Sequence, residues 1–210
     1  MSIESFKVVF VGETEVWKTS ILTQFIEKTF PKDIQTTTSS IFSTKTVICD
    51  GSKTLKFEIW DTAGQERYRH FAPMFYKDAN ALVIVYDVTK AKSFEEIKNY
   101  WINQIKENSP ENIILVIVAN KSDLIEQKQV DEGEARNFAN DLNAIFISTS
   151  AKNNEGIFNI FEELAKKYTG ATDIKIKEER DNKPNVEEGK GTFKIGNDKK
   201  GKKRKKGGFC

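Results

Sequence analysis

The segment that follows the first apolar run of the chain carries residue types suited to holding phosphate. Gly12 stands at its start, and Lys18 and Thr19 stand where a helical pattern begins. Backbone N–H groups at such a helix start bind phosphate oxygens, the lysine reaches the β and γ oxygens, and the hydroxyl after it holds Mg²⁺. The predicted phosphate-binding residues are Gly12, Glu13, Thr14, Glu15, Val16, Trp17, Lys18, Thr19 and Ser20.

Two residues of this loop depart from the pattern that phosphate loops follow. Trp17 stands directly before the lysine, where only glycine lets the backbone curl closely around phosphate. Glu15 places a carboxylate beside a polyphosphate, and like charges repel strongly in a poorly solvated site. We therefore expect Trp17 to displace the loop and both residues to weaken nucleotide binding. Taken alone, the segment leaves an ordinary strand-to-helix turn as an open alternative.

A second cluster, residues 60–66, follows a strand-like stretch and carries a carboxylate, a glycine and a glutamine in close order. At the end of a strand, Asp61 can hold the coordination shell of Mg²⁺, and the amide of Gly64 can face a γ-phosphate. Gln65 can orient the attacking water, which makes it the candidate catalytic residue. A plain polar turn would not require this order of side chains, so the cluster favours a phosphate site.

A third cluster indicates which base is bound. The Asp123 carboxylate can accept hydrogen bonds from two adjacent N–H donors of guanine that adenine lacks. This favours GTP and GDP over ATP and argues against a P-loop kinase or ATPase. A backbone amide after the next apolar run, residues 145–148, could reach the guanine carbonyl oxygen. The other predicted guanine-binding residues in these two segments are Asn120, Lys121, Ser150, Ala151 and Lys152.

These clusters need strands that bring them to one place. Residues 6–11, 81–86 and 113–118 are short, nearly continuous apolar runs rich in Val and Ile. Strands that are apolar on both faces are typical of a parallel sheet covered by helices. Because ligands of such sheets bind at the carboxyl ends of the strands, the clusters that follow these runs are expected to meet at one edge.

Helical and hairpin patterns complete the predicted fold. Apolar stripes at helical spacing begin at Ile21, Phe94 and Ile157. Residues 44–60 contain two strand-like stretches that flank Asp50-Gly51, which is a hairpin signal. We predict an α/β fold: an open, mostly parallel six-stranded sheet with one antiparallel edge hairpin and helices on both faces.

Length and composition indicate one folded domain and a tail. The chain has 210 residues, of which 38% are hydrophobic and 30% charged, and no apolar run reaches the roughly 18 residues of a membrane span. No signal-peptide pattern precedes residue 6, and two cysteines give no disulfide framework, so we expect a cytosolic protein. We predict a nucleotide-binding domain over residues 1–169 and a disordered, charged tail over residues 170–210.

The three clusters, in this order, resemble those of the Ras-like small GTPases, and the resemblance covers residues 6–168. Within that superfamily, residues 60–68 (WDTAGQERY) resemble the Rab family. The flanking KFEI at residues 56–59 and FAPMFY at residues 71–76 are similar to the early-endosomal branch of Rabs. The resemblance implies a GTP-hydrolysing molecular switch that binds GTP, GDP and Mg²⁺ and acts in vesicle-mediated or endosomal traffic.

The resemblance also assigns residues that the motifs alone do not. Thr37 falls where Rabs have a Mg²⁺-binding threonine, and Phe30 where an aromatic covers the guanine edge. Phe42, Trp60 and Phe75 fall on the aromatic effector-binding triad, although half-buried core aromatics remain an open alternative. The implied partners are effectors, an exchange factor, a GTPase-activating protein and a GDP-dissociation inhibitor.

The tail carries the predicted membrane attachment. Seven basic residues lie within residues 199–206, whereas the rest of the chain is net acidic, so the tail should seek an anionic membrane surface. By resemblance to Rabs, Cys210 is the predicted prenylation site, and one lipid with a polybasic patch gives the two signals that stable anchoring requires. Nuclear targeting or nucleic-acid contact is the weaker interpretation of the same residues, and no nucleic-acid partner is expected.

Two functions from different classes remain open. Asp61, Gln65 and Asp123 favour a regulatory GTPase that is slow without an activating protein. Trp17 and Glu15 favour a nucleotide-poor pseudo-GTPase that acts as an effector-binding scaffold.

Overall fold

One mixed sheet organises the chain. The structure, a computed structural model, describes residues 3–31, 37, 40–49, 53–64, 72–171 and 174. In their side-by-side order, the strands of the sheet are β2 (Ile41–Cys49), β3 (Lys53–Asp61), β1 (Ile3–Val11), β4 (Ala81–Asp87), β5 (Ile114–Asn120) and β6 (Ile145–Thr149). β2 pairs antiparallel with β3, and every other pairing is parallel. This confirms the predicted α/β class and its antiparallel edge hairpin.

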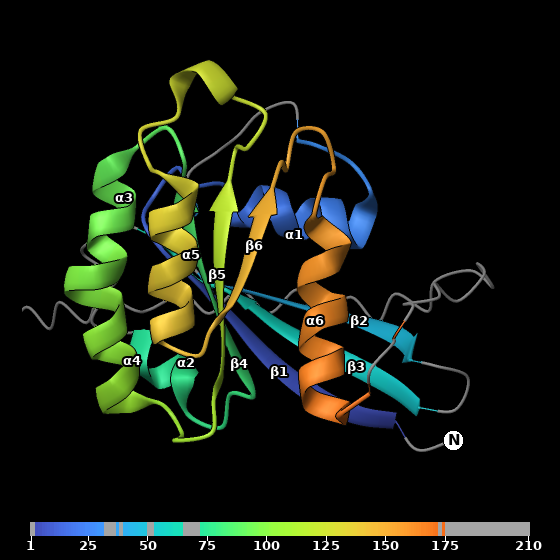
Figure 1. The fold of residues 1–210 in the computed structure, drawn as a ribbon. Helices are drawn as coiled ribbons and strands as arrows, with labels where there is room; N and C mark the ends of the chain where they lie inside the picture. Colours follow the sequence, from blue (N-terminus) through green and yellow to red (C-terminus); the bar gives the residue numbers. More distant parts are fainter. Residues whose placement is uncertain are drawn as a thin grey trace, which may run out of the picture.

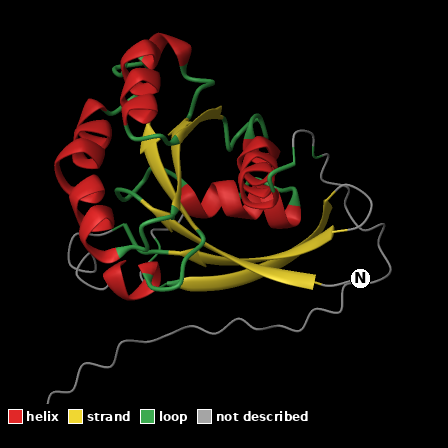
Figure 2. Cartoon of the chain, turned by 60° about the horizontal axis from the view of Figure 1, so that its bottom comes forward, coloured by secondary structure: helices red, strands yellow, loops and turns green. Residues whose placement is uncertain are grey.

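Helices cover both faces of this sheet, as predicted (Figure 1). α1 (Lys18–Glu27) and α6 (Ile157–Thr169) pack on one face against a core that includes Phe10 and Phe57. The elements on the opposite face are α2 (Ala72–Tyr76), α3 (Ala91–Glu96), the π-helical turn η2 (Ile97–Trp101), α4 (Ile102–Asn108) and α5 (Glu132–Asp141). α3, η2 and α4 follow one another without a break, and Figure 2 shows the two helical layers with the sheet between them.

The apolar runs form strands because they can be buried on both sides. All seven residues of β4 are buried, and in β1 the side chains alternate between the two cores. Val8 and Phe10 join the core under α1 and α6, whereas Val9 and Val11 join the opposite one. The five parallel strands therefore end along one edge of the sheet, where the loops that carry the predicted site residues begin.

Two helices were not marked by the apolar stripes of the sequence. α2 has only five residues, and the buried residues of α5 are the small Ala135 and Ala139, which give little apolar contrast. α5 begins instead at a polar signal, since the Asp131 side chain accepts a hydrogen bond from the backbone N–H of Glu134 (2.8 Å).

Some sequence predictions lie outside the described residues: the Asp50-Gly51 turn, Gln65, and the basic tail with Cys210. Among the residues that the structure does describe, no helix combines the length and the apolar character needed to span a bilayer.

Candidate functional site

The loop between β1 and α1 has the curled form that the phosphate-loop prediction requires. The Lys18 ammonium group donates to the carbonyl oxygens of Gly12 (3.0 Å) and Glu13 (2.9 Å), and the side chain is only 6% exposed. Burial lowers the pKa of Lys18 to about 8, although the carboxylate of Asp61 acts in the opposite direction. A charged amine held in this way is a ready partner for an anion.

Gly12 makes this curl possible. Its φ of +137° is rare for residues with a side chain, and a Cβ there would lie 2.3 Å from the carbonyl oxygen of Val85 in β4. The first residue of the loop is therefore glycine because the backbone of the neighbouring strand leaves no room for a larger one.

Three oxygen-bearing side chains meet at the start of α1. The Thr19 hydroxyl donates to Asp61 Oδ2 (2.5 Å) and lies 2.7 Å from the Thr37 hydroxyl. Asp61 Oδ1 is buried and has no hydrogen-bond partner among the described residues, and burial raises the pKa of this carboxyl group. A buried carboxylate oxygen without a partner and two adjacent hydroxyls match the hard oxygen ligands that Mg²⁺ prefers.

The set of ligands also suits a metal shared with a phosphate. Within the part of the chain that the structure describes, no group of three or more His, Cys, Asp or Glu side chains could hold a metal alone. Mg²⁺ sites commonly use one or two carboxylates and complete their shell with substrate phosphates and water. Thr19, Thr37 and Asp61 fit that type of site, with Lys18 beside them.

Gly64 brings the end of β3 against the phosphate loop. A Cβ at Gly64 would lie 2.5 Å from the carbonyl group of Glu13 and 2.6 Å from the backbone nitrogen of Thr14. The second cluster of the sequence therefore lies directly on the first, and only glycine allows this approach.

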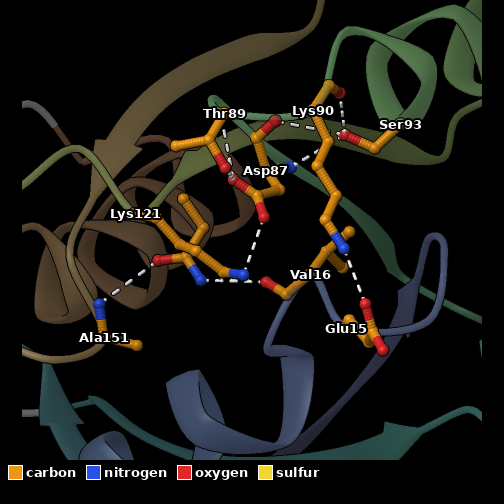
Figure 3. A network of polar contacts seen from close by, with 9 residues as sticks. Glu15, Val16, Asp87, Thr89, Lys90, Ser93, Lys121 and Ala151 are labelled. Carbon is orange, nitrogen blue, oxygen red and sulfur yellow. Dashed lines mark hydrogen bonds and ion pairs between the residues drawn. The ribbon is translucent and has the colours of Figure 1, made fainter. Parts of the chain in front are cut away.

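Asn120, at the end of β5, ties three loops together. Its Nδ2 donates to the Val16 carbonyl in the phosphate loop (2.9 Å). Its Oδ1 accepts from the Thr149 hydroxyl (3.0 Å) and the Ala151 amide (3.2 Å); Figure 3 shows Val16 and Ala151 in this network. Because both polar ends of this amide are bonded to protein, Asn120 positions the neighbouring loops.

The other residues predicted to bind the base lie around Asn120. Asp123 Oδ1 accepts a hydrogen bond from the Ser150 hydroxyl (2.6 Å), which orients the carboxylate. Lys121 forms a buried ion pair with Asp87 at the end of β4 (2.7 Å). Lys152 follows on the same loop as Ser150, with its side chain exposed. The loops after β1, β3, β5 and β6 thus form one connected site.

Comparison with known proteins shows which family the chain belongs to. A family model described as the Ras family matches residues 7–170. The human Ras-related protein Rab-22A is 42% identical over 167 residues, which cover 80% of this chain and 85% of that protein. The mouse Ras-related protein Rab-31 is 43% identical over 166 residues, which cover 79% of this chain and 84% of that protein. The chain belongs to the Rab branch of the Ras family. The family that the sequence motifs predicted is therefore confirmed.

Three aromatic side chains form a continuous row on this Rab. The Phe42 and Trp60 rings are 4.9 Å apart, and the Trp60 and Phe75 rings are 5.3 Å apart. All three residues are partly exposed, and Trp60 and Phe75 pack at the margin of the core under α2 to α5. The row therefore contacts the core and also presents a surface, and its role in binding effectors stays a prediction.

The Rab accommodates Glu15 by pairing it. The Lys90 ammonium group lies 2.6 Å from the Glu15 carboxylate, in an ion pair whose two side chains are about half exposed or more (Figure 3). The hydrogen bond from Lys90 and its charge lower the pKa of Glu15. A cation 75 residues away in the sequence therefore offsets part of the repulsion expected between Glu15 and a phosphate. The sequence offered no signal for this pair.

Trp17 adopts the left-handed backbone conformation in which glycine is usually found, with φ 67° and ψ 40°. Its indole ring centroid lies 5.3 Å from that of Phe30, and the Lys121 ammonium group lies 4.2 Å from the indole centroid. In the same structure Lys18 donates to the Gly12 carbonyl and Thr19 donates to Asp61. The indole is thus directed toward two predicted guanine-binding residues, and the expected displacement of the loop stays a prediction.

Proposed function

We propose that this Rab is a guanine-nucleotide switch that binds GTP and GDP with Mg²⁺, hydrolyses GTP slowly, and acts in endosomal or vesicle-mediated membrane traffic. The observation that carries the proposal is the network joining its loops. Asn120 bonds the phosphate loop to the loop after β6, and Thr19 bonds α1 to the end of β3. The residues that we propose to bind phosphate, metal and base thereby lie side by side.

Each part of the network has a role in this proposal. Lys18 and the backbone of the loop from Gly12 to Ser20 bind the phosphates, and Asp123 accepts the N–H groups of guanine. Phe30, Lys121 and the segment from Ser150 to Lys152 border the base. Thr19, Thr37 and Asp61 would hold Mg²⁺, which when bound neutralises charge on the phosphate oxygens.

Hydrolysis and switching are assigned to Gln65, Thr37 and Gly64. Gln65, which lies outside the described residues, orients the attacking water in this proposal. An activating protein that contributes an arginine would accelerate the step by about 10³- to 10⁵-fold. Thr37 contacts Thr19, and Gly64 lies against Glu13, so a γ-phosphate would hold both segments and its loss would release them.

The direct test is the identity of any nucleotide carried by the protein. We expect the natively purified full-length chain, after denaturation and chromatography, to release GDP or GTP rather than an adenine nucleotide. Absence of nucleotide, together with failure to bind added GDP and Mg²⁺, would contradict the proposed switch.

Thr19→Val tests the metal site, because valine keeps the shape of threonine and removes the hydroxyl. We expect GDP affinity in millimolar Mg²⁺ to fall roughly tenfold to a hundredfold, as for the loss of one hydrogen bond or ligand to a charged group. GDP affinity in excess EDTA should be unchanged. Thr23→Val, one turn further along α1, is the matched control. Equal losses with and without Mg²⁺ would argue against a metal role for Thr19.

The Rab resemblance supplies the proposed partners: effectors on the row of Phe42, Trp60 and Phe75, an exchange factor, a GTPase-activating protein and a GDP-dissociation inhibitor. Membrane attachment is proposed through a prenyl group on Cys210 and the basic residues 199–206. We expect mass spectrometry of the protein from its native cell to find the mass of one prenyl group on Cys210. Unmodified Cys210 would leave only electrostatic attachment.

The contact of Trp17 with Phe30 and Lys121 favours a second candidate function, a nucleotide-poor scaffold that keeps the Rab surface. The two candidates differ in one measurement. A scaffold binds its partner equally with and without GTP, whereas a switch binds it more tightly in the GTP form.

A further inference from the structure

The Trp17 indole lies at the base end of the site. It contacts Phe30, at 5.3 Å between ring centroids and 59° between planes, and the ammonium group of Lys121, at 4.2 Å from the indole centroid. These are the residues assigned to the guanine base above. An indole and a purine are both planar systems of a five-membered ring fused to a six-membered ring. The indole can therefore make the contacts that a purine base would make.

Neighbouring contacts hold the indole in this position. Lys121 is fixed by its ion pair with Asp87, and the Val16 carbonyl, directly before Trp17, accepts a hydrogen bond from Asn120. The indole also packs against the edge of the core under α1 and α6. The left-handed backbone conformation of Trp17 does not by itself set the direction of the side chain. The contacts of the side chain therefore decide where the indole lies.

The phosphate end of the site is formed while the indole is in place. Lys18 bonds the carbonyls of Gly12 and Glu13, and Thr19 bonds Asp61. The indole therefore lies against Phe30 and Lys121 while Lys18 and Thr19 hold their contacts within the protein.

We propose that the Trp17 indole is an internal ligand of the guanine site, and that a guanine nucleotide binds only after the indole has left Phe30 and Lys121. The proposal rests on the function proposed above. It makes Trp17 a specificity-determining residue, because only ligands that carry a base compete with it.

The experiment compares GDP with inorganic pyrophosphate as ligands of the full-length, nucleotide-free chain in Mg²⁺. Trp17→Gly and Trp17→Ala both remove the indole, and only the glycine variant also relieves the backbone. Lys28→Gly is the control, since Lys28 has the same left-handed conformation at the other end of α1 and is exposed. Calorimetry gives both affinities for each protein.

Both Trp17 variants should bind GDP roughly 10- to 100-fold more tightly than the wild type, from the sizes of an aromatic and a cation–π contact. Their affinity for pyrophosphate should stay within roughly threefold, and Lys28→Gly should behave as the wild type. In stopped flow, the wild-type rate of GDP association should level off as GDP increases, because opening limits it. The rates of both variants should keep rising.

Three results would overturn the proposal. Equal GDP affinity in the wild type and both variants would mean that the indole does not compete. A parallel gain in pyrophosphate affinity would mean that Trp17 acts on the phosphate loop, and a gain in Trp17→Gly alone would point to the backbone. If neither variant binds GDP, the proposed function itself fails. This outcome differs from the three above, so failure of the function and failure of the inference on Trp17 can be told apart.

Discussion

The Lys18→Met variant is expected to bind GDP roughly 10²- to 10⁴-fold more weakly than the wild type. Two charge-assisted hydrogen bonds to phosphate contribute about 1.5 to 3 kcal/mol each, and methionine can make neither. Lys18 is buried, so its ammonium group is held close to the loop and is little screened by solvent. Titration of a fluorescent GDP analogue into the nucleotide-free proteins measures the loss.

Lys92→Met is the matched control, since Lys92 is an exposed lysine of α3 outside the site. It should bind GDP as the wild type does. A Lys18→Met variant that retained wild-type affinity would contradict the phosphate-loop interpretation.

The same residue predicts how the stability of the nucleotide-free protein depends on pH. Burial lowers the pKa of folded Lys18 to about 8 from 10.5, so between these values the unfolded chain binds more protons than the folded one. The free energy of unfolding contributed by Lys18 therefore rises with pH through this range, and its burial is least favourable below pH 8. Relative to Lys18→Met, the wild type should gain about 2 kcal/mol between pH 8 and pH 10.

Urea unfolding of the two nucleotide-free proteins at both pH values measures this change, because the other titrating lysines cancel in the comparison. A difference that stayed constant would show that Lys18 keeps an ordinary pKa in the fold, and a difference that decreased as the pH rose would show that folding raises the pKa of Lys18.

The Asp123→Ala variant is expected to lose guanine recognition. Its carboxylate would accept two N–H groups of the base, and removing both charge-assisted bonds should lower GDP affinity by roughly 10²- to 10⁴-fold. ADP lacks that pair of donors, so its weaker binding should be unchanged. Competition titrations with GDP and ADP measure both affinities on the same protein.

Asp141→Ala, at the exposed end of α5, controls for the loss of a carboxylate elsewhere. Asp123 also accepts a hydrogen bond from Ser150, so the substitution removes a structural contact as well. Such an effect would weaken GDP and ADP binding equally, and that result would remove Asp123 from base recognition.

Several elements could be predicted because their signals are local. The apolar runs of β1, β4 and β5 formed buried strands, and the paired stretches around residues 50–51 formed the antiparallel β2–β3 edge. The periodic stripes formed α1, α3 to α4, and α6. α5 was not marked, because its fully buried residues are the small Ala135 and Ala139, which give a weak periodic signal.

The sequence by itself determined which apolar segments form strands and which polar side chains stand in the loops that follow them. Since parallel strands end at one edge of the sheet, these two features were enough to predict that Lys18, Asp61 and Asp123 lie along that edge. Only the tertiary structure decided the direction of the Trp17 indole and the pairing of Glu15 with Lys90. The physical reason is that backbone placement follows local periodicity, whereas the direction of a side chain is set by contacts with residues distant in the chain.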